Sequence, residues 1–256
     1  MAGHSKWANI KHRKARVDAA KGRIWSKCSK AIIAAARNGG GDPDTNLTLR
    51  YAIDEARYQN MPKDNIQRAI EKGAGAGQGD NYEEVTYEGY GPAGVAMIVL
   101  TLTDNNTRTV NDVRSIFKKH GGNMGQTGCV AFGFDTKGRI IVNGAAGLDE
   151  DKMMEVALEA GAEDVEAPDG ATDDEPGVWT VLADPTEFQQ VKVAIEAAGL
   201  TIAEAEIARI PQQTVEVRGD DVRKLINLVD ALEDNDDVQK VFSNSVIPDD
   251  ELAALG

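Results

Sequence analysis

The sequence predicts an α+β multidomain protein, with an N-terminal helical domain followed by two α/β domains, the last a ferredoxin-like βαββαβ unit inserted into the other. Apolar residues recur with helical spacing up to residue 73 and with the alternation of strands after it. The elements of residues 139–210 follow the order β-α-β-β-α-β of a ferredoxin-like split unit. The flanking stretches supply β-β-α-β and β-α-β, and neither closes a sheet alone. We therefore expect domains at residues 1–79, at 80–135 with 212–247, and at 136–211.

Residues 18–73 predict three helices. The first runs from Asp18, a candidate N-cap, to Gly39, because its apolar residues fall on one helical face. The second is indicated by apolar residues at i, i+3, i+4 and i+7 from Leu49. The third begins at Pro62, which suits the first helical position, and ends at Gly73. The glycine-rich residues 73–79 then predict a flexible linker.

The split domain is predicted from two separated stretches. Before the insertion, strands at Glu84–Tyr90 and Val95–Leu102 flank a Gly-Pro-Ala-Gly turn, and a helix ends at Gly121-Gly122. After the insertion come a strand at Thr214–Val217, an amphipathic helix around residues 222–232 and a strand at Val238–Phe242.

The inserted unit is marked by turn and capping signals. Strands are expected at Cys129–Phe134 and Arg139–Val142 around a turn at residues 135–138, followed by a helix capped by Asp149. A strand at Val178–Leu182 precedes Asp184–Glu187, which resembles a capping box with proline at the first helical position. The helix that follows ends at Gly199, and a last strand covers Thr201–Ile210.

Charge is unevenly distributed along the 256 residues, whose 28 basic and 42 acidic side chains give a net charge of −14. Residues 1–79 hold 15 basic and 7 acidic side chains, a balance of +8. Residues 80–256 hold 13 and 35, a balance of −22. A basic module joined to an acidic body indicates polyanion binding, although a solvated basic face that only aids solubility is the alternative.

The amino-acid composition limits the class of protein and the cellular compartment that the sequence fits. The longest apolar run, Gly94–Leu102, is half the roughly 20 residues that a membrane-spanning helix needs. Two lone cysteines do not make a disulfide scaffold and suit a reducing compartment. The opening residues lack the apolar core of a signal peptide, although their basic, acid-poor character leaves a transit peptide open. We expect a soluble, cytoplasmic protein without a membrane partner.

Catalytic and metal-binding motifs are missing from the sequence. The histidines and cysteines show no metal-ligand spacing, and the glycine-rich stretches fail the dinucleotide and P-loop patterns. No activated nucleophile pattern occurs. The acidic runs at residues 173–175, 233–237 and 249–251 are interpreted as solvated loops. We expect no enzyme activity, no cofactor, no metal and no small-molecule substrate.

The basic N-terminal segment provides the candidate nucleic-acid site. Lysine and arginine neutralise phosphates, Trp7 suits stacking on a base or sugar, and Asn9 and His12 suit donation to phosphates or base edges. The alternative is that Trp7 covers the helical core and the arm makes no contact. The predicted nucleic-acid-binding residues are Lys6, Trp7, Asn9, Lys11, His12, Arg13, Lys14, Arg16, Lys21, Arg23, Lys27 and Lys30.

A second, weaker basic patch follows in the split domain. It consists of Arg108, Arg114, Lys118 and Lys119, diluted by nearby aspartates, and a solvated helix face explains it equally well. The glycine-rich residues 121–126 offer backbone amides to a phosphate, with an ordinary turn as the default interpretation.

Four stretches resemble the YebC/PmpR family, which includes the mitochondrial translational activator of cytochrome oxidase. They are MAGHSKWANIKHRKARVDAAKG, RNGGGDPDTNLTLRYAIDEARYQNMPKDNIQRAIEKG, YEGYGPAGVA and GGNMGQTGCVAFGF, and they span most of the first 135 residues. The resemblance implies three domains, one split by another, and no enzyme activity. It also implies either DNA-binding transcriptional regulation or action in translation on the ribosome. Because the resemblance starts at the first residue, it argues against a transit peptide.

The leading hypothesis is a non-enzymatic nucleic-acid-binding regulator of gene expression, specifically a DNA-binding transcriptional regulator. One alternative is a ribosome-associated translation factor that binds ribosomal RNA. A second is a protein-interaction scaffold, in which the acidic domains dock a partner.

Overall fold

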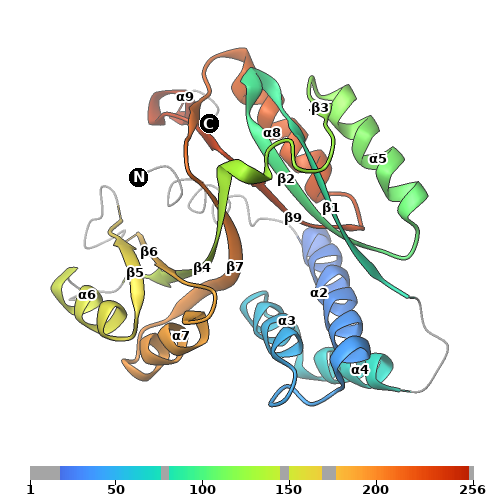
Figure 1. Ribbon diagram of the computed structural model, residues 1–256. Coiled ribbons are helices and arrows are strands. Elements are labelled where there is room, and N and C mark those ends of the chain that lie inside the picture. Colours follow the sequence, from blue (N-terminus) through green and yellow to red (C-terminus); the bar gives the residue numbers. More distant parts are fainter. Residues whose placement is uncertain (1–17, 76–80, 145–149, 169–176, 254–256) are drawn as a thin grey trace. The chain divides into compact units, whose positions relative to one another are not determined.

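The computed structural model describes residues 18–75, 81–144, 150–168 and 177–253 (Figure 1). These residues form two compact units, one made of residues 135–210 and one made of the chain on either side of them. Helices and largely antiparallel sheets occur together, which confirms the α+β multidomain class. Within the described residues, none of the helices is both long and apolar enough to cross a membrane.

The helical domain consists of α2 (Asp18–Gly39), α3 (Leu47–Tyr58) and α4 (Lys63–Ala74), which confirms the three predicted helices. In Figure 1 they lie together as the blue to teal cluster, and α2 packs against both of the others. Asn46 caps α3 by accepting a hydrogen bond from the Leu49 amide at 3.1 Å. Its side-chain amide also donates to the Ala35 and Gly40 carbonyls, which ties the α2–α3 connection to the end of α2.

Glycine at position 73 belongs to α4 and is buried, although the sequence placed the end of the helix there. A β-carbon on Gly73 would lie 2.5 Å from the Ile33 carbonyl oxygen and 2.7 Å from the Ala36 β-carbon. Gly73 is therefore needed for the close approach of α4 to α2. Residues 76–80 of the predicted linker lie outside the described residues.

The split domain is built on an antiparallel sheet of order β3-β1-β2-β9. Its strands are β1 (Glu83–Tyr90), β2 (Ala96–Thr103), β3 (Asn123–Met124) and β9 (Val238–Ser243). A 3₁₀ turn at Pro92–Gly94 joins β1 to β2. Two helices cover the sheet: α5 (Asn106–Lys119) contacts β1 and β3, and α8 (Asp220–Glu233) contacts β9. The split domain also contains a short parallel strand pair and a last helix. The pair consists of β8 (Val215–Glu216) and β10 (Ser245–Val246), and the helix is α9 (Asp249–Ala253).

The ferredoxin-like unit contains β4 (Phe134–Asn143), α6 (Glu150–Glu159), β5 (Ala162–Glu166), β6 (Val178–Ala183), α7 (Phe188–Ala197) and β7 (Ile202–Pro211). Its sheet order is β5-β6-β4-β7, so the first strand lies between the third and the fourth. The element order and sheet confirm the predicted βαββαβ unit. The hydrophobic pattern does not predict the residues of β5, because this short stretch is acidic and only partly buried.

The predicted turn at residues 135–138 is wrong, because β4 runs through it without interruption. Gly138 pairs with Ala183 of β6, and a β-carbon there would lie 2.5 Å from the Phe188 ring. The glycine thus makes room for an aromatic side chain of α7 and does not mark a turn.

Two further local predictions are wrong. Residues 184–187 form no capping box: Asp184 accepts hydrogen bonds from the Thr186 amide and hydroxyl, and α7 begins only at Phe188. The strand expected at Cys129–Phe134 is instead a loop with a 3₁₀ turn at Ala131–Gly133, for a reason given below. Asp149, the predicted cap of α6, lies outside the described residues.

Candidate nucleic-acid interface

The structure describes four of the twelve predicted nucleic-acid-binding residues, Lys21, Arg23, Lys27 and Lys30, all on α2. The other eight lie outside the described residues: Lys6, Trp7, Asn9, Lys11, His12, Arg13, Lys14 and Arg16. Lys21 is exposed near the start of α2. The remaining three share one face of the helix, and we call Arg23, Lys27 and Lys30 the α2 stripe.

All three residues of the α2 stripe contact the last residue of α8 or the segment that joins α8 to β9. Arg23 lies 3.1 Å from the Asp234 carboxylate. Lys27 donates to the backbone carbonyl of Glu233. Lys30 donates to the Asp236 carbonyl at 2.9 Å and to the Asp237 carboxylate at 3.0 Å. The stripe therefore holds α2 against the split domain.

The end of α8 attracts cations for two reasons. The last carbonyls of a helix lack intrahelical partners and carry the negative end of its dipole. Glu233 is the last residue of α8, and three aspartates follow it within four residues. The interpretation of residues 233–237 as a solvated run is wrong for Asp237, whose side chain is only 4% exposed.

Asp237 is the centre of a buried polar cluster. Its carboxylate accepts hydrogen bonds from Lys30 at 3.0 Å, from Arg108 at 2.7 Å and from the Thr109 hydroxyl at 2.8 Å. Burial alone would raise the pKa of Asp237, but these donors outweigh it and hold that pKa below its usual value. One carboxylate thus joins α2, α5 and the start of β9.

The second basic patch divides into two parts. Arg108 pairs with both Asp104 and Asp237, so two carboxylates neutralise its charge. Arg114, Lys118 and Lys119 are exposed on α5, and α5 contacts β3 directly. The cationic part of this patch therefore lies at the C-terminal half of α5.

A buried carboxylate, Glu88 on β1, organises the loop after β3. It accepts hydrogen bonds from the backbone amides of Gly128 at 2.7 Å and of Val130 and Ala131 at 2.8 Å. These amides are then unavailable to a strand ladder, which is why residues 129–133 are not a strand. Burial acts to raise the pKa of Glu88, but the three amides lower it below its usual value.

The glycine-rich residues 121–126 turn at Gly121, which has a positive φ, and then enter the short strand β3. Gly122 donates to the Phe117 carbonyl, and Gly125 donates to the Glu88 carbonyl, both at 2.8 Å. A β-carbon on Gly125 would lie 2.5 Å from the Cys129 sulfur, so this glycine allows the loop to fold back on itself. The turn interpretation is confirmed at Gly121 and is wrong for Asn123–Met124, which pair with β1 as strand β3, and the amides of Gly122 and Gly125 are not offered to a phosphate.

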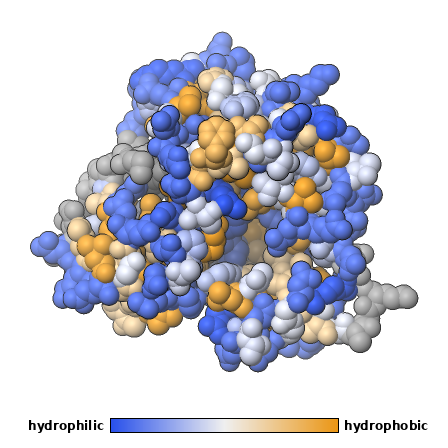
Figure 2. Space-filling model, viewed as in Figure 1, coloured by the Kyte–Doolittle hydropathy of each residue, from blue (hydrophilic) through white to orange (hydrophobic). Residues whose placement is uncertain are grey.

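Two exposed aromatic residues, Phe132 and Tyr90, were missed from the sequence. Phe132 is 79% exposed, and Tyr90 is 41% exposed. The Tyr90 hydroxyl donates to the Cys129 carbonyl at 3.1 Å, so its side chain reaches the loop that carries Phe132. In Figure 2 most of the visible surface is hydrophilic, and a pale orange apolar patch lies over the start of β4. The sequence had no signal for this exposure, because the pattern around Phe132 predicts a strand at Cys129–Phe134.

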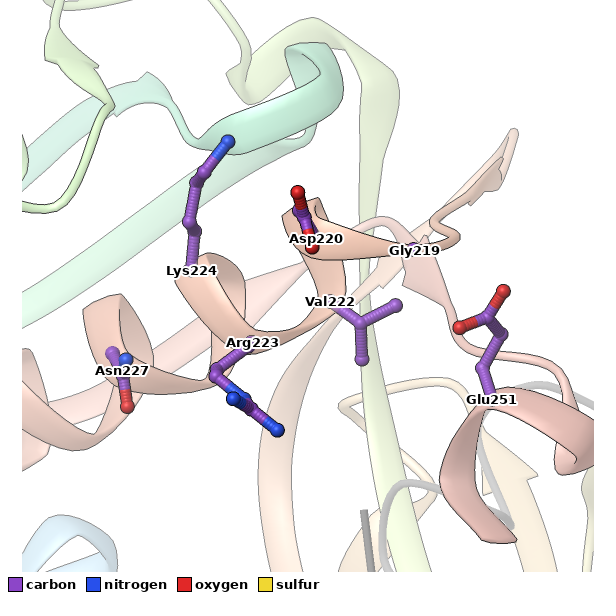
Figure 3. Close-up of a pocket in the computed structure, with 7 residues that line it drawn as sticks. All are labelled: Gly219, Asp220, Val222, Arg223, Lys224, Asn227 and Glu251. Carbon is purple, nitrogen blue, oxygen red and sulfur yellow. The ribbon is translucent and has the colours of Figure 1, made fainter. Parts of the chain in front are cut away.

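A hollow of about 430 Å³ lies at the start of α8 (Figure 3). Its lining mixes charges of both signs, including Asp220, Arg223, Lys224 and Glu251. In Figure 3 the Lys224 and Arg223 side chains point in opposite directions, so the charged groups do not converge on one point. The hollow shows no arrangement of acid, base and nucleophile.

The described residues also provide no metal cluster and no activated thiol. Among them, no group of three His, Cys, Asp or Glu side chains could hold a metal ion. Burial raises the pKa of the Cys28 thiol to about 12, and burial together with Glu88 raises that of Cys129. A thiol with a raised pKa is a poor nucleophile at neutral pH.

Two family models match the chain and together cover most of it. The TACO1/YebC protein N-terminal domain matches residues 5–76, and the TACO1/YebC second and third domain matches residues 82–245. The chain belongs to the TACO1/YebC family. The first match contains the helical domain with the basic segment before it. The second contains the split domain and the ferredoxin-like unit.

Relatives of this TACO1/YebC protein match over nearly the whole length. A probable transcriptional regulatory protein of Dictyoglomus turgidum is 50% identical over 255 residues and covers all of both chains. One of Ralstonia nicotianae is 56% identical over 247 residues, with 96% of this chain and 99% of its own covered. Among solved structures, a conserved hypothetical protein of Aquifex aeolicus is 45% identical, with a TM-score of 0.83. That match covers 95% of this chain and 98% of the other.

Proposed function

We propose that this TACO1/YebC protein is a non-enzymatic, nucleic-acid-binding regulator of gene expression in the cytoplasm, and that it acts as a DNA-binding transcriptional regulator. The observation that carries the proposal is the full-length similarity to relatives named probable transcriptional regulatory proteins. The lack of a catalytic arrangement in the hollow at α8 supports a non-enzymatic role. The segregation of positive charge into residues 1–79, the proposed nucleic-acid-binding domain, agrees with phosphate binding.

Within that domain, the residues before α2 are the main phosphate-binding group. The α2 stripe is engaged by the α8–β9 segment, so its three cations serve primarily to hold α2 in place. Lys6, Lys11, Arg13, Lys14 and Arg16 form five basic side chains with no acidic residue among residues 1–17. With Lys21 they provide about six phosphate contacts. Trp7, Asn9 and His12 would add stacking and polar contacts.

The salt dependence of DNA binding tests this proposal. With about six phosphate contacts, affinity for a DNA duplex should fall roughly a thousandfold between 50 and 200 mM salt. The triple variant Lys11→Ala/Arg13→Ala/Lys14→Ala should bind at least about tenfold more weakly and lose about half of the salt slope. Fluorescence anisotropy of a labelled duplex at several salt concentrations measures both quantities.

The matched control removes three positive charges from the same domain at exposed positions of α4, as Lys63→Ala/Arg68→Ala/Lys72→Ala. It should retain the wild-type salt slope. If both triple variants weaken binding equally, the net charge of the domain and not the N-terminal segment is responsible. A salt-independent affinity of the wild-type protein would exclude the electrostatic mechanism.

A second candidate is RNA binding as a ribosome-associated factor, and the exposed ring of Phe132 favours it. Bases in a DNA duplex are stacked inside, whereas RNA loops present unpaired bases to aromatic side chains. Two experiments separate the candidates. A ribosome-associated factor should sediment with ribosomal subunits, whereas a DNA-binding regulator should selectively shift a promoter duplex. A protein-interaction scaffold would keep its partner in the Lys11, Arg13 and Lys14 triple variant, whereas either nucleic-acid function would be weakened.

A further inference from the structure

Phe132 is an exposed aromatic side chain whose backbone is held in place. It lies in the 3₁₀ turn at Ala131–Gly133, with 79% of its surface exposed. The Glu88 carboxylate fixes the amides of Val130 and Ala131, and the Gly133 carbonyl accepts a hydrogen bond from Gln212 at 2.9 Å. The backbone is therefore anchored on both sides of the ring. A ring presented this way loses little conformational entropy on binding.

A second exposed ring, that of Tyr90, is hydrogen-bonded to the same loop. Tyr90 ends β1, pairs through its backbone with Asn123 of β3, and reaches Cys129 with its hydroxyl. Cys129 precedes Phe132 by three residues in the loop that Glu88 organises. Tyr90 and Phe132 are therefore two exposed aromatic side chains tied to the same loop, and we call this pair the aromatic platform.

The stretch of sequence that carries Phe132 differs in charge from the rest of the body. Residues 80–256 carry 35 acidic side chains, yet residues 113–134 contain none. The same stretch contains Arg114, Lys118 and Lys119, exposed on α5, and α5 contacts β3 beside Tyr90. An anionic partner is therefore favoured at this site, while the acidic surface elsewhere repels it.

We propose that the aromatic platform stacks on unpaired bases of single-stranded RNA, while Lys118 and Lys119 neutralise the adjacent phosphates. Aromatic rings beside cations are how proteins bind single strands without reading a sequence. An apolar protein partner is less favoured, because the neighbours of Phe132 in sequence are glycine and alanine and provide little further apolar area. The inference rests on the proposed nucleic-acid function and adds a second contact site, in the split domain.

Substitutions at Phe132 separate stacking from simple apolar contact. Phe132→Ala and Phe132→Leu should each weaken binding to an unstructured single-stranded RNA by about 5- to 100-fold, since both remove the aromatic face. Phe132→Trp should retain wild-type affinity. None of the three should change binding to an RNA duplex of the same sequence. The side chain is exposed, so the variants should fold, and Leu47→Ala, at another apolar position that is 52% exposed, is the matched control.

The outcomes distinguish this inference from the proposed function. Loss of single-strand binding in Phe132→Ala and Phe132→Leu, with duplex binding intact, supports the platform. If all Phe132 variants bind single-stranded RNA like the wild type, or if Phe132→Leu retains full affinity, the stacking platform is wrong while the N-terminal phosphate site stands. If the wild-type protein binds a DNA duplex but not the single-stranded RNA, the platform alone fails. If it binds neither single-stranded RNA nor a DNA duplex, the platform and the proposed function both fail.

Discussion

At the scale of single residues, Glu88 shows how a buried charge determines loop structure. An unpaired buried carboxylate would be costly, but three backbone amides donate to this one. The carboxylate also satisfies these three amides, which donate to it and not to the backbone of a strand, because the loop is not part of the sheet. The position of Phe132 therefore depends on a side chain more than 40 residues away in sequence.

The pH dependence of stability follows from the lowered pKa of Glu88. A carboxylate whose pKa is lower in the folded than in the unfolded state stabilises the fold above its usual pKa, and this stabilisation is lost as the pH falls. We expect Glu88→Gln to be less stable than the wild type at pH 7, by about 1–3 kcal/mol. We also expect the variant to lose less stability than the wild type as the pH falls from about 5 to about 3. Urea unfolding at a series of pH values measures both.

Asp237 has a lowered pKa as well and contributes in the same direction, so only the difference between wild type and variant reports on Glu88. Parallel stability curves for the two proteins over this pH range would contradict the assignment.

At the scale of elements, α2 and α4 approach closely because small residues meet at their crossing. Gly73 faces Ile33 and Ala36 of α2 without room for a β-carbon. The hydrophobic period located both helices from the sequence but gave no information on how closely they pack. The local pattern therefore predicts the start of a linker at this glycine.

Alanine substitutions at two helical glycines test this packing. Gly73→Ala should destabilise the protein by about 1–3 kcal/mol, because α2 and α4 must move apart. Gly22→Ala, in α2 with open space around it, should stabilise by up to about 1 kcal/mol, because alanine has the higher helix propensity. Thermal unfolding followed by circular dichroism compares them. A stabilising Gly73→Ala would show that the crossing is looser than described.

At the scale of the larger compact unit, the α2 stripe and Asp237 connect parts of the chain that lie about 200 residues apart. Part of the positive charge that indicates nucleic-acid binding is instead bonded to acceptors within the protein, at the end of α8 and in the segment after it. This leaves the segment before α2, together with Lys21, as the main proposed phosphate contact. The Lys240–Glu55 pair, at 3.1 Å, is a further link between β9 and α3.

Removing the Asp237 charge tests this connection. Asp237→Asn should cost about 3 kcal/mol of stability, because Lys30 and Arg108 then face a neutral side chain in a buried cluster. Asp234→Asn breaks only the exposed pair with Arg23 and should cost less than about 1 kcal/mol. Denaturant unfolding of both variants gives the comparison. Equal effects would mean that burial of Asp237 adds nothing to the connection.

The sequence by itself determined the α+β class, the helical domain, the βαββαβ insertion and the separation of charge. These depend on local hydrophobic period, on element order and on composition, all of which can be read along the chain. The tertiary structure decided which cations are paired internally, why Gly73 and Gly138 are glycines, and where Phe132 is displayed. Each of these depends on a partner distant in sequence, such as Asp237 for Lys30 or Glu88 for the loop, and no local pattern encodes that partner.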